Sequence, residues 1–287
     1  MKRVIKVGTR KSLLALKQTE MAVDALKSRF PELEFETVGI STRGDRNLEK
    51  PLGEIGDKGL FVSEIERLIK TGEIDFAVHS GKDLPLELYE GLEISGVLSR
   101  DDRRDVLVTK KGRGFENLKT IGTGSKRRAL QCSKLVENCD FKLIRGNINT
   151  RLEKLYRGEY DAIILAAAGL DRLKLYKDSR FDFRPFTEEE MIPAACQGII
   201  VIEALKNSDV SELIKAVQCE KTRKEFDCER YILKLLGGDC SASIGASAKF
   251  NEGIISCSVM YGDKRSYFET DEKSFKATAE KYIRDMI

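Results

Sequence analysis

The sequence predicts an α/β protein with two similar α/β domains and a small α+β domain at the C-terminal end. Three observations support this prediction. Short apolar segments with strand character alternate with helical segments over the first two-thirds of the chain. The alternation starts again after a run of charged residues at 101–105, and its βαβ character indicates a parallel or mixed sheet with helices on both faces. After Gly237, short strand-like segments and a closing helix replace the alternation.

The first domain is predicted to contain three strands, two helices and one long loop. The strands are 3–8, 35–41 and 74–78, and the helices are 11–30 and 60–70. The loop, residues 42–58, is polar and rich in glycine. Loops of that length inside a compact domain are often lids, so we expect a mobile loop near a functional site.

The remaining elements follow from the same patterns. The predicted strands are 106–108, 120–121, 141–144, 162–165, 199–202, 244–249, 253–260 and 265–269, and the predicted helices are 125–135, 150–156, 211–236 and 273–285. A second crossing between the first two domains is expected within 192–202. We therefore predict a first domain of residues 1–97 and 195–213, a second of 98–194 and a third of 214–287.

Composition excludes several classes of protein. The 287 residues are 41% hydrophobic and 34% charged, with a net charge of +3, which gives no support for a nucleic-acid or membrane partner. No apolar run is long enough to span a bilayer, and residues 1–7 form a short alternating strand rather than a signal peptide, so we expect a cytoplasmic protein. Seven scattered cysteines without a CxxC pair, and a single histidine, predict no metal site.

The segment 77–85 is the first candidate for chemistry. It follows the apolar strand 74–78, contains the only histidine, His79, and places Asp83 beside Lys82. Ligands collect at the carboxyl ends of strands in open α/β sheets, so Asp83 is a candidate acid or base. A plain surface turn, with Asp83 as a capping residue and His79 in a structural role, is the alternative.

Five arginines occupy equivalent places, just beyond predicted strands and at the starts of helices: Arg10, Arg127, Arg128, Arg145 and Arg151. Helix N-termini attract anions, and guanidinium groups add bidentate recognition of carboxylate or phosphate. We interpret the group as the binding site of a polyanion in the cleft between the two domains. Solvated helix ends are the alternative for each arginine taken singly. No Walker A or complete dinucleotide motif occurs.

Cys240 lies among small residues at 237–245, in a loop that precedes a strand. A cysteine in such a loop could be a nucleophile or an attachment point, and an ordinary loop thiol is the alternative.

Together these residues resemble the porphobilinogen deaminase (hydroxymethylbilane synthase) family, and the resemblance covers essentially the whole chain. The matching segments are Gly8–Gln18, Thr42–Asp45, Lys58–Glu64, Ala77–Pro85, Gly122–Arg128, Arg145–Leu152, Gly169–Leu173, Gln197–Gly198 and the loop around Cys240. Each is modest evidence alone, but their number and order are specific.

The resemblance implies two domains similar to a periplasmic-binding-protein pair around a cleft, followed by the small third domain. It implies stepwise head-to-tail condensation of four porphobilinogen molecules, with release of ammonia and of hydroxymethylbilane, by a monomer. It also implies a dipyrromethane cofactor on Cys240 and a catalytic Asp83. The binding residues that it implies are Arg10, Ser12, Lys58, Ser80, Lys82, Thr123, Ser125, Arg127, Arg128, Arg145, Arg151, Arg172 and Gln197.

Four positions depart from the family pattern. Gly81 replaces a larger apolar residue, Cys196 and Asp239 stand where glycine is common, and Ser243 stands where proline is common. These departures affect the expected loop geometry and cofactor loading more than the class of activity. Two other classes remain open on the residues alone: a non-catalytic solute-binding module, and another lyase or transferase without a covalent cofactor.

Overall fold

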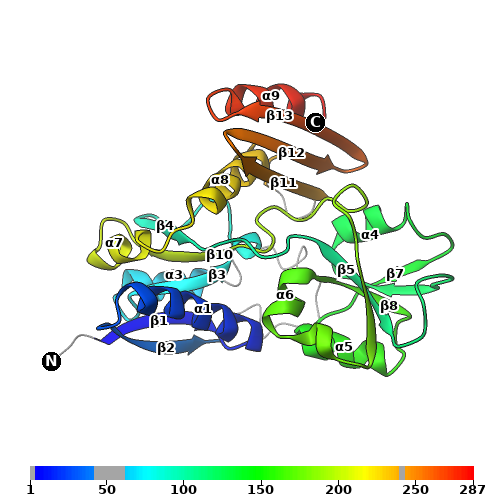
Figure 1. The fold of residues 1–287 in the computed structure, drawn as a ribbon, viewed down its shortest axis with the longest axis horizontal. Coiled ribbons are helices and arrows are strands. Elements are labelled where there is room, and N and C mark those ends of the chain that lie inside the picture. The colour runs from blue at the N-terminus through cyan, green and yellow to red at the C-terminus, as the bar shows by residue number, and fades with distance from the viewer. Residues whose placement is uncertain (1–3, 42–61, 239–242) are drawn as a thin grey trace.

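The computed structural model describes residues 4–41, 62–238 and 243–287. Two five-stranded mixed sheets and one three-stranded antiparallel sheet organise these residues (Figure 1). The prediction of two α/β domains and a small C-terminal α+β domain is confirmed. The predicted mobile loop 42–58, together with Lys58 and Cys240, lies outside the described residues. No helix in the described part of the chain is long and apolar enough to cross a membrane.

The first sheet has the strand order β2-β1-β3-β10-β4. Its strands are β1 (Val4–Arg10), β2 (Glu34–Ile40), β3 (Phe76–Ser80), β4 (Leu92–Val97) and β10 (Ile200–Leu205). Strands β1, β2 and β3 run parallel, and β10 lies antiparallel to both β3 and β4. Apolar residues of α1 (Leu13–Arg29) pack with Phe76 and Val78, and those of α3 (Ser63–Lys70) pack with Ala77, so helices cover both faces.

The second sheet repeats that pattern, with the order β7-β6-β8-β5-β9. Its elements are β5 (Asp105–Lys110), β6 (Thr120–Gly122), α4 (Lys126–Cys132), β7 (Asp140–Lys142), α5 (Ile148–Tyr156), β8 (Ala162–Ala166), α6 (Ala167–Arg172) and β9 (Phe181–Pro185). Strand β5 is antiparallel to β8 and β9, as β10 is to β3 and β4. In each sheet the antiparallel strand is therefore the one reached by a crossing from the other sheet.

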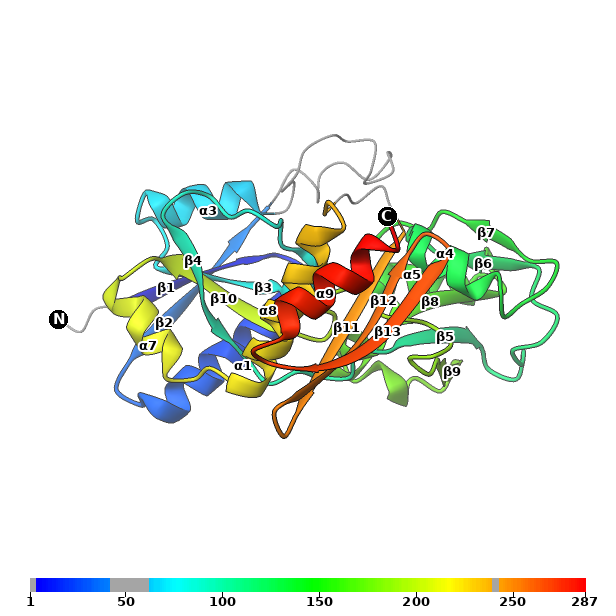
Figure 2. The ribbon, with the colours of Figure 1, turned by 90° about the horizontal axis from the view of Figure 1, so that it is seen from above.

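The C-terminal sheet is a meander of β11 (Ile244–Asn251), β12 (Ile254–Tyr261) and β13 (Lys264–Asp271). Figure 2 shows it lying across the other two sheets, with α8 (Glu220–Leu235) and α9 (Phe275–Arg284) along it. A single apolar cluster includes Val201 of the first sheet, Ile232 of α8 and Val259 of the third. The third domain is therefore packed directly on the first.

The predicted continuous helix 211–236 is wrong. The chain forms α7 (Asp209–Lys215) and then α8, separated by a short connection. The backbone N–H of Cys219 donates to the carbonyl of Val97 at 2.8 Å. That bond ties the connection to the end of β4, so one straight helix cannot continue through it. The sequence analysis also missed β4, β9 and α6, whose short apolar runs carry little periodicity.

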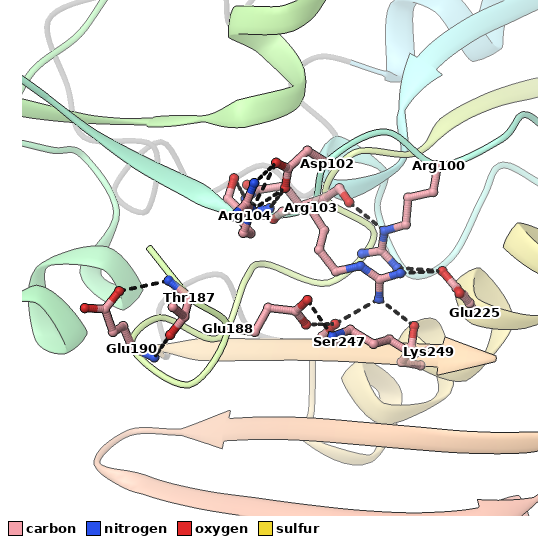
Figure 3. Close-up of polar contacts among 12 residues, drawn as sticks. Arg100, Asp102, Arg103, Arg104, Thr187, Glu188, Glu190, Glu225, Ser247 and Lys249 are labelled. Atoms are coloured by element: carbon pink, nitrogen blue, oxygen red, sulfur yellow. Dashed lines mark hydrogen bonds and ion pairs between the residues drawn. The ribbon is translucent and has the colours of Figure 1, made fainter. Parts of the chain in front are cut away.

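The first crossing segment, residues 98–104, connects β4 of the first sheet to β5 of the second. A buried ionic cluster joins this segment to the third domain (Figure 3). Arg100 Nη1 lies 2.6 Å from Glu229 Oε1, and Arg103 Nη2 lies 2.8 Å from Glu225 Oε2. Arg103 also donates to the carbonyl of Ala248 on β11 at 2.7 Å. Burial opposes the charge on Arg100, but Glu229 raises the pKa of this guanidinium above its usual value. Charges this well buried must be paired for the fold to be stable.

We predict that Glu229→Gln lowers the free energy of unfolding by about 3 kcal/mol, because it leaves the Arg100 guanidinium buried beside a neutral amide. The exposed pair of Lys224 and Glu272 supplies the control, since Glu272→Gln should cost no more than about 1 kcal/mol. Denaturant unfolding of both variants measures the difference. Equal costs would show that burial of the cluster is unimportant.

Candidate functional site

The turn that carries Asp83 is fixed by its neighbours. Strand β3 ends at Ser80 and continues into a 3₁₀ turn, Gly81–Asp83. The N–H of Gly81 donates to the carbonyl of Ile199 at 2.9 Å, and Gln18 Nε2 donates to Ser80 Oγ at 2.7 Å. The turn is thus held to the beginning of β10 and to α1, while the Asp83 side chain remains exposed.

Asp83 lies at a cavity of about 60 Å³. Predicted site residues Arg10, Ser12 and Ser80 line this cavity with it, as do Gln18 and His79. Their convergence has a simple origin, because β1 and β3 are parallel neighbours and their carboxyl ends meet at one edge of the sheet. The hydroxyl of Ser12 also caps α1 by accepting from the N–H of Ala15 at 3.2 Å.

In the second domain, one buried carboxylate positions two of the predicted arginines. Asp105, at the start of β5, has no exposed surface. Its Oδ2 lies 2.8 Å from Arg127 Nη1, and its Oδ1 lies 2.8 Å from Arg128 Nη2. Despite burial, the two guanidinium groups hold the pKa of Asp105 well below its usual range. Two cations around one anion leave a net positive charge at this point.

Gln197 connects this group to the Asp83 turn. Its Nε2 donates to Asp105 Oδ1 at 3.0 Å, and its Oε1 accepts from Lys82 Nζ at 3.2 Å. The Lys82 residue is exposed, yet protein groups around its ammonium desolvate it and lower its pKa to about 8. Asp83 opposes that shift, whereas Arg127 and Arg128 reinforce it. Gln197 thus links predicted site residues of both domains.

Arg151 belongs to the same electrostatic group. It lies on α5, and its Nε donates to the carbonyl of Gly146 at 2.8 Å. Burial, and then the nearby cations Arg128 and Arg145, lower the pKa of Arg151 to about 10. Asp83 is the carboxylate that opposes this effect. No ion pair joins Arg151 to a carboxylate among the described residues.

Thr123 and Ser125 shape the turn before α4. Thr123 Oγ1 accepts from the N–H of Ser125 at 3.1 Å, and Ser125 Oγ caps α4 by accepting from the N–H of Arg128. Both hydroxyls therefore already have backbone partners.

Arg172 contacts both crossing segments, residues 98–104 and the second one, residues 186–199. Its Nε donates to Asp101 Oδ2 at 2.8 Å, and its Nη2 donates to the carbonyl of Gly198 at 2.8 Å. The side chain is almost fully buried. The structure thus gives Arg172 two partners, one on each crossing segment, and its contact with a ligand stays a prediction.

Sequence analysis missed Asp105 as an organising residue, and it included Gln197 as a binding residue without its bridging role. Asp105 appeared only as the end of a charged run, although its position directly before Val106, Leu107 and Val108 was a usable signal for a buried carboxylate. The role of Gln197 as a bridge depends on contacts distant in sequence and had no such signal.

Two departures from the family pattern, Gly81 and Cys196, contact each other in the structure. A Cβ placed on Gly81 would lie 3.1 Å from the Cβ of Cys196, closer than ordinary packing allows. Cys196 adopts φ of +60°, a conformation that favours glycine, and its side chain is buried. The Cys196 side chain therefore fills the space beside Gly81, which has no side chain of its own.

The fold and the charges define an α/β protein whose site gathers desolvated cations from two domains around one exposed carboxylate, as expected for binding a small polyanion. The family model for "Porphobilinogen deaminase, dipyromethane cofactor binding domain" matches residues 5–212. The chain belongs to the porphobilinogen deaminase family.

Curated relatives agree with that assignment. The porphobilinogen deaminase of Streptococcus sanguinis is 44% identical over 254 residues, which cover 87% of this chain and 83% of the relative. That of Syntrophobacter fumaroxidans is 40% identical, with coverage of 99% and 93%.

Similar solved structures include the VFT2 domain of Bordetella pertussis BvgS, with a TM-score of 0.45, 13% identity and coverage of 75% of this chain and 86% of that one. The periplasmic sulphonate-binding protein SsuA of Escherichia coli has a TM-score of 0.44, 12% identity and coverage of 84% and 72%.

We predict that the space shared by Gly81 and Cys196 couples their substitutions. Gly81→Ala should cost about 1 kcal/mol or more, because the new methyl group meets the cysteine side chain. The same change in a Cys196→Gly background should cost less by at least about 0.5 kcal/mol. A double-mutant cycle of denaturant unfolding measures this coupling, and additive costs would exclude the compensation.

Proposed function

We propose that the chain condenses four porphobilinogen molecules head to tail on a dipyrromethane attached to Cys240, with Asp83 as the catalytic carboxylate. The observation that carries this proposal is the placement of Asp83. It shares a cavity with Arg10 and Ser12 and interacts electrostatically with Arg151 and Lys82. One exposed carboxylate thus stands among cations that the fold has partly desolvated.

The cations suit both substrate and cofactor. Each porphobilinogen ring carries an acetate and a propionate, so the ligand becomes more anionic with every addition. The residues proposed to pair with these groups are Arg10, Lys82, Arg127, Arg128, Arg145 and Arg151, with Ser12, Ser80, Thr123, Ser125, Lys58, Arg172 and Gln197 as further contacts. Carboxylate–guanidinium pairs are strong and directional, which favours a fixed orientation of each ring.

The charges of the described residues suit a bound dipyrromethane. Desolvation and like charge lower the pKa of Lys82 to about 8 and that of Arg151 to about 10. Such desolvated cations are stabilised when carboxylates enter the site. When bound, the dipyrromethane supplies a pyrrole carbon nucleophile and a covalent anchor for the growing product.

Asp83 acts on the substrate. Loss of ammonia from the aminomethyl group leaves positive charge spread over the substrate's pyrrole ring. A carboxylate beside the ring stabilises this charge and can accept a hydrogen bond from the ring nitrogen. Lys82 and Arg151 surround Asp83 with positive charge. We propose that the protein works as a cytoplasmic monomer.

Intact-protein mass spectrometry tests the proposal. The purified chain should carry a mass excess equal to a dipyrromethane, located at Cys240 by peptide mapping, and Cys240→Ser should lack it. A chain that stays unmodified after incubation with porphobilinogen would refute the proposal. That result would favour a solute-binding module if ligand binds without turnover, or a different lyase or transferase if turnover occurs.

We predict that Asp83→Ala lowers turnover by about 100-fold or more, because charge stabilisation at the reacting ring is lost. Asp83→Asn should behave similarly, since the amide keeps the shape without the charge. Single-turnover assays measure the effect, and thermal unfolding should show that both variants remain folded. Near-normal turnover in either variant would exclude the proposed role.

Lys82 should give substrate binding a dependence on pH. Its pKa of about 8 means that the ammonium is charged below this pH and loses its proton above it. KM for porphobilinogen should therefore rise as the pH increases through about 8. Lys82→Arg, which stays charged, should remove this rise, and Lys82→Met should have a high KM throughout. An unchanged pH profile in Lys82→Arg would contradict the prediction.

A further inference from the structure

His79, the only histidine of the sequence, contacts one buried carboxyl group and interacts electrostatically with a second, and the proposed function uses neither. His79 Nε2 lies 2.9 Å from Glu203 Oε2, and Glu203 has no exposed surface. Glu66, on α3, is also buried and forms a hydrogen bond with Glu203. The three groups come from β3, β10 and α3, so the fold rather than a local motif brings them together.

Strand register explains the arrangement. His79 pairs with Val201, and Ala77 pairs with Glu203, across the antiparallel β3 and β10. Directly opposed residues and alternate residues share one face of a sheet, so His79 and Glu203 lie on the same face. Ala77 packs there against Ile65 and Ile69 of α3. This is the face from which Glu66 approaches.

The hydrogen bonds fix where the protons must be. Glu203 Oε1 is buried and has no conventional donor, and Glu66 Oε1 already accepts from the N–H of Tyr89 at 3.0 Å. Donation from a protonated Glu66 would satisfy Glu203 Oε1. Burial, and then the charge of Glu203, raise the pKa of Glu66 above its usual value, which is consistent with a protonated carboxyl.

Glu203 is then the acceptor of the shared proton, and its other oxygen needs a donor. Nε2–H of His79 is that donor, because two acceptors cannot form a hydrogen bond. Among the described residues, no hydrogen bond occupies Nδ1. Nor does any group of three or more His, Cys, Asp or Glu within the described ranges have an arrangement suited to a metal ion. Proton sharing therefore accounts for the trio better than metal binding.

We propose that Glu66 and Glu203 share one proton and hold His79 as the Nε2–H form, so that Nδ1 gains and loses a proton at the wall of the Asp83 cavity. His79 is thus a positioning residue that acts through Asp83. Its imidazole lines the same cavity, so its charge changes the electrostatic environment of the catalytic carboxylate. The effect on turnover rests on the proposed function, whereas the position of the proton does not.

Other charged groups around the trio are few. Helix α8 contributes Arg230, which interacts electrostatically with Glu203 and donates to the carbonyl of Leu86 at 2.6 Å. Helix α3 contributes Glu66, and the turn after β3 contributes Asp83. Arg230 partly balances the Glu203 carboxylate. Protonation of His79 at Nδ1 then adds a positive charge at the wall of the cavity.

The single histidine makes the proton position directly measurable. In holoenzyme labelled with ¹⁵N-histidine, one imidazole gives two nitrogen signals, and a proton-bearing nitrogen differs clearly in shift from a bare one. Above the imidazole titration, Nε2 should carry the proton and Nδ1 should be bare. The opposite assignment would overturn the proposal, whether or not the protein acts on porphobilinogen.

Two matched variants test which carboxyl group donates and which accepts in the hydrogen bonds that link Glu66, Glu203 and His79. Glu66→Gln should leave the tautomer and the titration midpoint almost unchanged, because an amide N–H donates to Glu203 as the protonated carboxyl does. Glu203→Gln should lower the midpoint by about one pH unit or more and abolish the fixed tautomer, because the counter-charge is lost. Equal effects of the two variants would overturn the assignment of the shared proton.

Turnover supplies the last measurement. The pH profile of kcat should contain a limb whose midpoint matches the His79 titration, and His79→Gln should shift or remove this limb. A purely structural role would lower kcat by the same factor at every pH, which would refute the coupling to Asp83. Absence of turnover in the wild-type holoenzyme would refute the proposed function instead, and the tautomer result would stand.

Discussion

The site depends most on the buried carboxylate of Asp105. It pairs with Arg127 and Arg128, and through Gln197 it is connected to Lys82. Asp105 begins β5, the strand that enters the second domain, and Gln197 lies just before β10, the strand that returns to the first. One desolvated anion therefore fixes side chains on both crossing segments. Removal of one member of a buried ionic group leaves the charges of the others uncompensated. Substitution of a single member of this group should therefore destabilise the site.

The repeated topology explains why the ligand-binding residues face the same region. Each five-stranded sheet has four strands that run in one direction and one antiparallel strand that arrives from the other sheet. The carboxyl ends of β1 and β3 carry Arg10 and the Asp83 turn, and the end of β6 leads into the turn before α4. The third domain stabilises the first crossing through Arg100 and Glu229. Fold and site therefore depend on the same crossing segments.

Much of this could be predicted from the sequence, for physical reasons that also explain the failures. Alternating apolar segments predicted the α/β domains, and helix starts after strands predicted the arginine positions. The break between α7 and α8 could not be predicted, because it depends on a bond from Cys219 to Val97, far away in the chain. Likewise, Gly81 and Cys196 looked like separate departures, although only their contact explains either. Periodicity records which face of an element is buried, whereas such contacts depend on the tertiary fold.

The charge balance of the site connects its stability with its ligand. Lys82, Arg127 and Arg151 all have lowered pKa values, because each is desolvated and close to other cations. Replacing some of these cations would stabilise the protein without a ligand, so their presence is best explained by an anion that balances them. Carboxylates entering the site stabilise the charged forms, and binding must then be accompanied by proton uptake at Lys82 near pH 8. The cations that destabilise the fold in the absence of a ligand are therefore the groups that bind a chain of pyrroles, because each pyrrole carries two carboxylates.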